Sequence, residues 1–255
     1  MSPAARISHS IRTAAASGEP ALVAYLTAGF PARALFRAHV RALADAADVV
    51  EIGVPFTDPM ADGVTIQRAS LAALAQGVSL RWILQELSAI GTLPAPLLLM
   101  SYLNPLLAFG PELAAHAAAA GVAGFIVPDL PLDESSELRA ALGAQGLALV
   151  QMVTPVTRPE RLRQLCAGSQ GFVYAVTMTG TTGKNVAVPE DVVHYLDAVR
   201  ALAPVPVCAG FGIRSRAQVE RLRGHVDGVV VGSALVEVLE RGEDPQAWLG
   251  ALRGR

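Results

Sequence analysis

Two carboxylates that could carry out proton transfer, Glu51 and Asp62, lie in one short segment of the chain. The first of them directly follows residues 47–50, which have the apolar pattern of a buried strand. Carboxylates are depleted in strands and are costly to bury without a partner. Burial would raise the pKa of Glu51, so that it could donate and accept protons near neutral pH. The segment therefore predicts a site of acid–base chemistry.

A structural role is the alternative for these acids. Glu51 and Asp62 could form a pair that backbone donors satisfy, and Asp58 and Asp62 could cap the turn and the helix that follows. For Asp58 we favour capping or contact with a partner. Glu51 is different because it ends a buried strand and would face the mouth of the predicted barrel. It is therefore the candidate acid–base residue.

Two glycine motifs late in the chain, at 210–212 and 232–233, indicate a phosphate site. Each follows a predicted strand, and the second opens a helix. Glycine lets the backbone approach a ligand, and a helix N-terminus presents N–H groups to an anion. Either motif alone could be an ordinary turn. Together, after the last two strands of a barrel, they predict phosphate binding but identify no reaction.

Residues 177–188 are small, polar and rich in glycine. They could form a flexible connection, or a lid whose Thr182 and Gly183 reach the ligand when it closes. We favour the lid. The segment is not a nucleotide-binding P-loop, because the required spacing of glycine, lysine and hydroxyl residues is absent.

Apolar, β-prone runs alternate with amphipathic stretches along the whole chain, which predicts an α/β fold with parallel strands. Eight such repeats predict a single (β/α)8 TIM barrel, with an extra N-terminal helix before about residue 20 and a short helix at the phosphate site. The predicted strands are 21–26, 49–52, 97–100, 124–127, 147–152, 172–176, 205–209 and 228–231. The predicted helices are 33–44, 71–89, 112–120, 135–142, 159–165, 189–201, 216–222 and 235–241.

The composition of the 255 residues excludes several classes of protein. A formal net charge of −2 provides no general attraction for nucleic acid or an anionic membrane surface. Only two cysteines are present, Cys166 and Cys208, which fits a reducing compartment. No secretion signal is recognisable, and the longest apolar run, 113–127, is too short to span a membrane. We expect a cytoplasmic protein with a single domain over 1–255, and no metal-binding cluster.

The segment 51–67, EIGVPFTDPMADGVTIQ, closely resembles the signature of the tryptophan synthase alpha subunit family. Further matches to this family follow in order and at compatible spacings along nearly the whole chain. They lie at 24–29, 100–105, 128–131, 171–174, 179–183, 210–212 and 232–233.

The resemblance implies retro-aldol cleavage of indole-3-glycerol phosphate to indole and glyceraldehyde 3-phosphate, without a cofactor in this chain. By analogy, Glu51 delivers a proton to indole C3 and removes one from the side-chain hydroxyl. Asp62 would bind the indole N–H and stabilise the positive charge that develops, and Tyr174 would hold Asp62 in place.

The resemblance also implies residues for the two ends of the substrate and for contact with a partner. The indole pocket would be formed by Tyr25, Leu99, Tyr102, Ile126 and Met152. The phosphate would be bound by Gly183, Phe211, Gly212, Gly232 and Ser233. The lid and partner loops would contain Asp58, Pro59 and Thr182.

The implied partner is a tryptophan synthase beta subunit, which would contain pyridoxal phosphate and form an α2β2 assembly. Three positions depart from the family: Phe30 replaces a frequent Asp, Val64 a usual Pro, and Met178 an Arg found in some relatives. Val64 and Met178 lie in loops that communicate with the beta subunit in the family. The alternatives are a stand-alone lyase that releases free indole, a catalytically silent phosphate-binding barrel, and another phosphosugar enzyme such as an isomerase.

Overall fold

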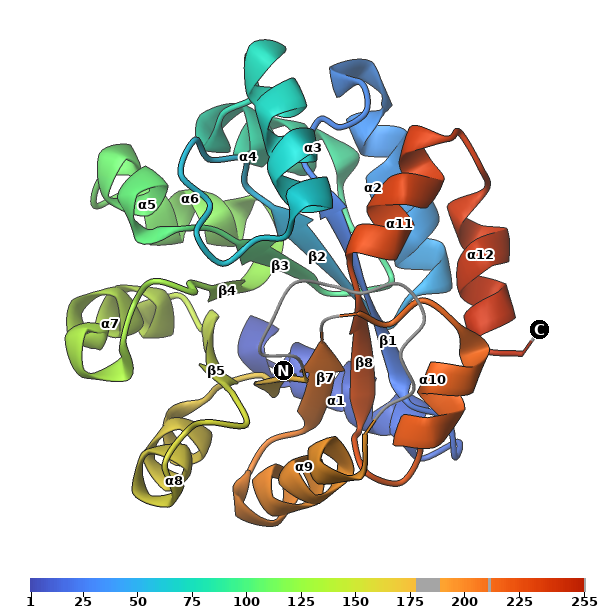
Figure 1. The fold of residues 1–255 in the computed structure, drawn as a ribbon. Helices are drawn as coiled ribbons and strands as arrows, with labels where there is room; N and C mark the ends of the chain where they lie inside the picture. Colours follow the sequence, from blue (N-terminus) through green and yellow to red (C-terminus); the bar gives the residue numbers. More distant parts are fainter. Residues whose placement is uncertain (178–188, 211, 255) are drawn as a thin grey trace.

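The computed structural model describes residues 1–177, 189–210 and 212–254. Within them, parallel strands pair in sequence order, and β8 pairs with β1 to close a barrel (Figure 1). The predicted TIM barrel is therefore confirmed. The strands are β1 (Ala21–Thr27), β2 (Val49–Gly53), β3 (Leu97–Met100), β4 (Val122–Ile126), β5 (Ala148–Val153), β6 (Val173–Val176), β7 (Val207–Gly210) and β8 (Gly228–Val231).

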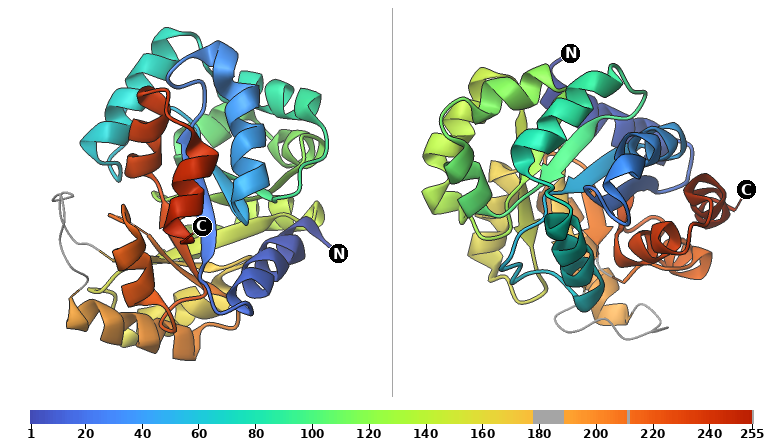
Figure 2. Two further views of the ribbon diagram at one scale, coloured as in Figure 1. Left: turned by 90° about the vertical axis from the view of Figure 1, so that its right-hand side faces the viewer. Right: turned by 90° about the horizontal axis from the view of Figure 1, so that it is seen from above.

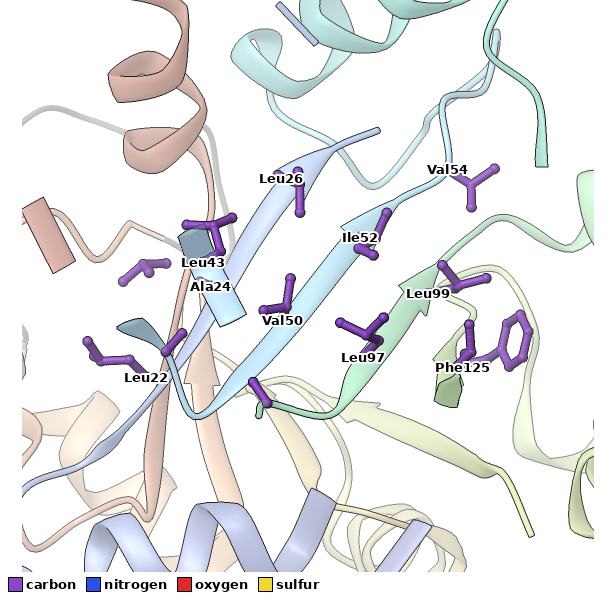
Figure 3. Close-up of a cluster of buried hydrophobic side chains, with 14 of the residues drawn as sticks. Leu22, Ala24, Leu26, Leu43, Val50, Ile52, Val54, Leu97, Leu99 and Phe125 are labelled. Atoms are coloured by element: carbon purple, nitrogen blue, oxygen red, sulfur yellow. The ribbon is translucent and has the colours of Figure 1, made fainter. Parts of the chain in front are cut away.

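Alternate residues of each strand contribute to two separate apolar layers, because successive side chains of a strand point to opposite faces. In β1, Leu22, Ala24 and Leu26 belong to the outer layer between strands and helices (Figure 3). Val23 and Tyr25 belong to the cluster inside the barrel. The strand sequence thus decides which side chains can reach a site in the barrel.

Helices surround the barrel, as the alternating pattern predicts (Figure 1). Within the described residues, no helix is both long and apolar enough to cross a membrane. Two short 3-10 turns, Arg33–Leu35 and Leu132–Glu134, precede helices. The helices are α1 (Pro3–Ala15), α2 (Phe36–Ala46), α3 (Val64–Ala75), α4 (Leu80–Ile90), α5 (Leu103–Phe109), α6 (Leu113–Ala119), α7 (Ser136–Ala144), α8 (Pro159–Gly168), α9 (Glu190–Leu202), α10 (Arg216–Leu222), α11 (Ser233–Glu240) and α12 (Pro245–Leu252).

The predicted helix at 71–89 is wrong, because two helices, α3 and α4, occupy this part of the chain. The break falls at Gly77, whose φ of +76° is a left-handed conformation that glycine adopts without strain. Ser79 then caps α4 by accepting a hydrogen bond from the N–H of Trp82 at 3.3 Å. The first of the two helices, α3, begins at Val64, immediately after the acidic loop.

Two helices, α5 and α12, lie where no helix was predicted. Both are short, and both carry a proline near the N-terminus, Pro105 and Pro245, where a missing N–H is tolerated. The last helix extends the fold beyond the predicted helix at 235–241. That predicted helix corresponds to α11, the short helix after strand eight.

The predicted N-terminal helix is α1, which lies across one end of the barrel (Figure 2). Ile7 and Ile11 are fully buried in the interior cluster. The Ser8 hydroxyl donates to the carbonyl of Gly171 at 2.5 Å, and that of Ser10 donates to the carbonyl of Asp48 at 2.7 Å. Both acceptors lie just before strands, so α1 closes the N-terminal end and leaves the opposite end for a ligand.

Candidate active site

A pocket opens at the C-terminal ends of the strands, where enzymes with this barrel place their chemistry. It encloses about 610 Å³ of space when its opening to solvent is counted. It is lined by Tyr25, Glu51, Asp62, Gly63, Thr65, Ile66, Met100, Tyr174, Gly212, Val230, Gly232 and Ser233. Both candidate carboxylates and three of the predicted phosphate-binding residues therefore share one cavity.

Glu51 projects from β2 into the barrel, opposite Tyr25 on one neighbouring strand and Leu98 on the other. It is only 1% exposed. Burial, and secondarily the negative charge of Asp62, raise the pKa of Glu51 from its usual 4.5 to about 8. Its Oε2 atom has no hydrogen-bond partner in the part of the chain that the structure describes. Glu51 is thus a buried acid that faces the pocket and is protonated at neutral pH.

Asp62 lies in the loop between β2 and α3, close to Tyr102. The Tyr102 hydroxyl accepts a hydrogen bond from the N–H of Ala61, the residue before Asp62, at 2.9 Å. Burial raises the pKa of Asp62 from 3.8 to about 6, and the hydrogen bond from Tyr102 opposes this rise. Asp62 is therefore mostly ionised at neutral pH.

The acidic loop is held by two further contacts. The ring of Phe56 stacks on that of Tyr102, with 5.3 Å between the centroids. The side-chain amide of Gln67 on α3 donates to the backbone carbonyl of Asp62 at 2.9 Å. Sequence reasoning assigned the holding of Asp62 to Tyr174 and placed Tyr102 in the indole pocket. In the structure Tyr174 lines the pocket and Tyr102 does not, while the Tyr102 hydroxyl anchors the loop through the N–H of Ala61; the holding role of Tyr174 stays a prediction.

Tyr25 and Tyr174 form two walls of the pocket, and each needs a glycine on the neighbouring strand. A Cβ atom on Gly53 would lie 2.1 Å from the Tyr25 hydroxyl oxygen. A Cβ atom on Gly210 would lie 2.3 Å from that of Tyr174. Burial raises the pKa of both tyrosines well above their usual range, so both hydroxyls stay neutral.

The prediction that Leu99 lines the pocket is wrong. Leu99 belongs to the outer layer, where it packs between the strands and the helices (Figure 3). The residue that lines the pocket from β3 is Met100, its neighbour on the inner face. Ile126 and Met152 do face the barrel interior and pack in the cluster of Tyr25, but the pocket lining does not include them.

Sequence reasoning missed several pocket residues, although the strand pattern contained part of the signal. Leu98 pairs with Glu51 and therefore points into the barrel. Met100, two residues further along β3, points the same way. Since Val230 is in register with Val23, it shares a face with Tyr25. The other missed residues, Gly63, Thr65 and Ile66, lie at the start of α3. This helix was predicted to start at residue 71 instead of Val64. The missed residues are Gly63, Thr65, Ile66, Met100 and Val230.

The predicted phosphate end is formed by backbone groups rather than by charged side chains. Gly212 follows β7 with a φ of +84°, and Gly232 and Ser233 open α11. The side chain of Gln218 holds the loop after β7: it donates to the carbonyl of Gly212 at 3.1 Å and accepts from the N–H of Arg214 at 2.8 Å. The start of α11 presents N–H groups without partners in the helix, which favours an anion.

Three predicted site residues, Thr182, Gly183 and Phe211, lie outside the described residues. The two other residues of the predicted partner loops are placed beside the pocket. Asp58 is exposed and accepts a hydrogen bond from the Thr57 hydroxyl at 2.5 Å. Pro59 is half-buried, and its carbonyl accepts the N–H of Asp62 at 3.1 Å.

The described lining of the pocket contains two acids and no basic side chain. No cluster of histidine, cysteine, aspartate and glutamate within the described residues could hold a metal ion. The pKa of Asp62 is about 6 and that of Glu51 is about 8. At neutral pH the site therefore contains one ionised carboxylate, Asp62, and one protonated carboxyl group, Glu51. Such a separation is typical of sites where one carboxylate transfers a proton and the other stabilises charge.

Comparison with known proteins identifies relatives over nearly the whole length of the chain. The family profile described as "Tryptophan synthase alpha chain" matches residues 11–251. The alpha chain of Nitratidesulfovibrio vulgaris is 46% identical, covering 97% of this chain and 98% of that protein. The alpha chain of Solidesulfovibrio magneticus is 45% identical, covering 96% of each.

Solved structures agree with these relatives. A chain of Mycobacterium tuberculosis tryptophan synthase superposes with a TM-score of 0.88 and 38% identity, covering 98% of this chain and 97% of that one. A chain from the tryptophan synthase α2β2 complex of Pyrococcus furiosus superposes with a TM-score of 0.85 and 34% identity, covering 92% and 98%.

Proposed function

The chain belongs to the tryptophan synthase alpha chain family, and we propose that its pocket cleaves indole-3-glycerol phosphate to indole and glyceraldehyde 3-phosphate. This makes the chain a lyase of tryptophan biosynthesis. The observation that carries the proposal is the protonated Glu51 beside the ionised Asp62, in one cavity with a phosphate-binding end.

Glu51 is both acid and base in the proposed cycle. Its carboxyl group first delivers a proton to C3 of the indole, which breaks the aromaticity of the ring. The resulting carboxylate then removes the proton from the adjacent side-chain hydroxyl. The electron pair of that O–H bond forms the aldehyde C=O, the carbon–carbon bond breaks, and its electrons restore the indole ring. Glu51 ends the turnover protonated, as it began.

Asp62 stabilises the intermediate and does not transfer a proton. Protonation at C3 places positive charge on the indole nitrogen, and the Asp62 carboxylate accepts a hydrogen bond from that N–H. An ionised group already held by Tyr102 needs no rearrangement when the charge develops, which is the basis of electrostatic catalysis. Tyr25, Met100 and Ile66 supply apolar surface for the ring.

The phosphate is held at the other end of the cavity. Gly212, Gly232 and Ser233 line the pocket, and their backbone N–H groups and the Ser233 hydroxyl are the donors that we assign to the phosphate. Gly183 and Phe211 complete this site in the proposal, as the family resemblance implies. Binding of the phosphate places the reacting carbon atoms of the substrate near Glu51.

We propose a tryptophan synthase beta chain as the partner, in an α2β2 assembly in which pyridoxal phosphate belongs to the beta chain. The Pyrococcus furiosus relative supports this, because it belongs to an α2β2 complex. The surface around the pocket also supports it: Met60, Leu107 and Val156 are 86%, 67% and 78% exposed and all follow C-terminal strand ends. A partner that covered these side chains would remove apolar surface from water, which favours association.

The other readings of the sequence receive less support. A silent barrel would not need a buried, unpaired Glu51, and another phosphosugar enzyme would leave the acidic loop unexplained. A stand-alone lyase would use the same site residues, but the family is named for the synthase. We also propose a single domain over 1–255 and a cytoplasmic location, which two buried free cysteines support.

The test is incubation of the purified chain with indole-3-glycerol phosphate, with indole measured as it appears. We expect indole from the wild type, and a large stimulation when a beta chain is added. High activity that a beta chain does not change would instead identify a stand-alone lyase. No indole under either condition would contradict the proposed reaction.

A further inference from the structure

Arg214 and Glu237 form an ion pair directly behind the phosphate end of the pocket. The Nη1 atom of Arg214 donates to Oε2 of Glu237 at 2.9 Å, and Nη2 donates to Oε1 at 2.7 Å. Such two-pronged contacts between guanidinium and carboxylate are strong and fix the geometry of both side chains. Each side chain is only 27% exposed, so solvent screens the pair incompletely.

Each residue of this pair is close in sequence to a pocket residue. Arg214 follows Gly212 by two positions in the loop after β7, and Glu237 follows Ser233 by four positions on α11. Residues four apart lie on the same face of a helix, about 6 Å along its axis. The carboxylate of Glu237 is therefore about one helical turn from the end of α11 that would bind phosphate.

Glu237 also contacts α3, the helix that follows the loop of Asp62. The hydroxyl of Thr65, which lines the pocket from the first turn of α3, donates to Oε1 of Glu237 at 3.3 Å. One carboxylate thus joins α11, α3 and the loop after β7, and α3 and α11 lie side by side (Figure 1). Each of these three segments contributes a residue to the pocket lining.

The charge of Glu237 is unfavourable where it lies, unless Arg214 cancels it. A phosphate monoester is an anion, and no basic side chain lines the described part of the pocket. A lone carboxylate one helical turn behind the phosphate would repel it over a distance at which a partly buried charge still acts. Arg214 removes this repulsion while leaving the carboxylate free to hold Thr65.

We propose that Arg214 and Glu237 are positioning residues that form a charge-neutral support for the phosphate end of the site. Glu237 holds the three segments together, and Arg214 prevents its charge from weakening the binding of a phosphate monoester. The inference rests on the proposed phosphate-ester substrate. It concerns residues behind the site and not the groups that touch the phosphate.

The test is the affinity of glycerol 3-phosphate, measured by calorimetry for the wild type and for three variants. Glu237→Gln keeps an oxygen for Thr65 but frees the positive charge of Arg214, so we expect affinity to increase roughly threefold to tenfold. Arg214→Gln removes the direct partner of the carboxylate and leaves only the electrostatic influence of Arg68 and Arg241, which form their own pairs with Glu240 and Glu243, so we expect a decrease that is smaller than the increase. The double variant should bind about as well as the wild type.

Ionic strength and kinetics extend the test. The two opposite shifts should shrink as salt is added, because added ions screen charges that do not touch the ligand. For indole-3-glycerol phosphate, the changes should be in KM rather than in kcat, since neither residue contacts Glu51 or Asp62. Thermal unfolding of each variant checks that the fold is intact.

The chain contains a matched control in the exposed pair Arg68 and Glu240, which also joins α3 to α11. Glu240 follows Ser233 by seven positions rather than four, its pair is more exposed than that of Glu237, and no hydrogen bond among the described residues joins it to Thr65, so Glu240→Gln should leave the affinity unchanged. Should Glu237→Gln bind glycerol 3-phosphate no better than the wild type, the proposed charge balance would be wrong, even if Arg214→Gln failed to fold. Failure of the wild type to bind any phosphate ester would instead refute the phosphate end of the proposed function.

Discussion

Asp48 and Glu51 are three positions apart in the chain, yet the barrel gives their carboxylates opposite surroundings. Asp48, just before β2, accepts hydrogen bonds from the N–H of Leu22 at 2.7 Å and from Arg253 at 2.6 Å. Glu51, inside β2, has an Oε2 atom without a partner in the described part of the chain. One end of the barrel pairs its acid, and the other leaves its acid unpaired.

The same contrast extends to the second acid at each end. Asp227, before β8, accepts the N–H of Val207 at 2.8 Å and pairs with Arg200 at 3.4 Å. Asp62, at the pocket, has a tyrosine hydroxyl as its partner rather than a cation. Asp48 and Asp227 use their carboxylates to hold strand N–H groups and arginines, whereas burial raises the pKa values of Glu51 and Asp62. Partner type therefore separates structural acids from reactive ones in this barrel.

The largest expected effect is that of Glu51→Gln. Removal of the group that moves both protons should reduce the rate of indole release by about 10²-fold to 10⁴-fold or more. The variant keeps the shape of the side chain, so a folded protein is expected. Indole release from indole-3-glycerol phosphate is the measurement, and a variant that retained wild-type activity would contradict the role of Glu51.

Stability should change in the opposite direction for the same variant. The pKa of Glu51 is about 8 in the folded chain against a usual 4.5, so ionisation opposes folding increasingly as pH rises between these values. Glutamine lacks this penalty. Urea unfolding should therefore show Glu51→Gln gaining stability over the wild type at pH 8, and little or no gain near pH 4.5.

Replacement of Asp48, at the opposite end of β2, should lower the stability of the fold without changing the activity. Asp48→Ala would leave the N–H of Leu22 and the guanidinium of Arg253 without their acceptor. We expect a loss of about 2–3 kcal/mol in the free energy of unfolding, since the pair is only partly buried. Urea unfolding at pH 7 measures the loss, and kcat should stay near the wild-type value. A fall in kcat comparable to that of Glu51→Gln would erase the distinction between the two ends.

Tyr102→Phe should have the smallest of these effects. Loss of its hydrogen bond removes the interaction that lowers the pKa of Asp62, so this pKa should rise above its value of about 6. The acidic limb of the kcat/KM profile should then move to higher pH, and activity at neutral pH should fall by about tenfold. Tyr174→Phe is the comparison: if it moved the acidic limb further than Tyr102→Phe, the holding role predicted for Tyr174 from the sequence would be right.

Much of the fold could be predicted because strand and helix periods are local properties of the chain. All eight predicted strands overlap observed ones, and the helix at 216–222 has the predicted bounds. The single helix predicted at 71–89 was wrong, because Gly77 adopts a left-handed conformation and Ser79 caps a second helix. The short helices α5 and α12, with seven and eight residues, were missed.

The site residues could be predicted where the residue type alone indicates the chemistry. They were harder to predict where their role depends on the direction in which the side chain points. Glu51 and Asp62 stand out in the sequence because acids are unusual beside a buried strand. Leu99 was assigned to the pocket without regard to strand alternation, and the register of β3 with β2 shows that Met100 faces inward instead. The hydrogen bond from the N–H of Ala61 to the Tyr102 hydroxyl joins residues 41 positions apart, and no local pattern indicates it.

The sequence by itself determined the alternation of strands and helices, the two acids and the glycine motifs, since each depends on the type and order of neighbouring residues. Only the tertiary structure decided which acid is paired and which is not. Glu51 is buried at the open end of a closed barrel, whereas Asp48 is half-buried at its plugged end, and that difference in solvation and partners separates their roles. The ion pair behind the phosphate end depends equally on tertiary structure, because packing brings Arg214, Glu237 and Thr65 together from three segments.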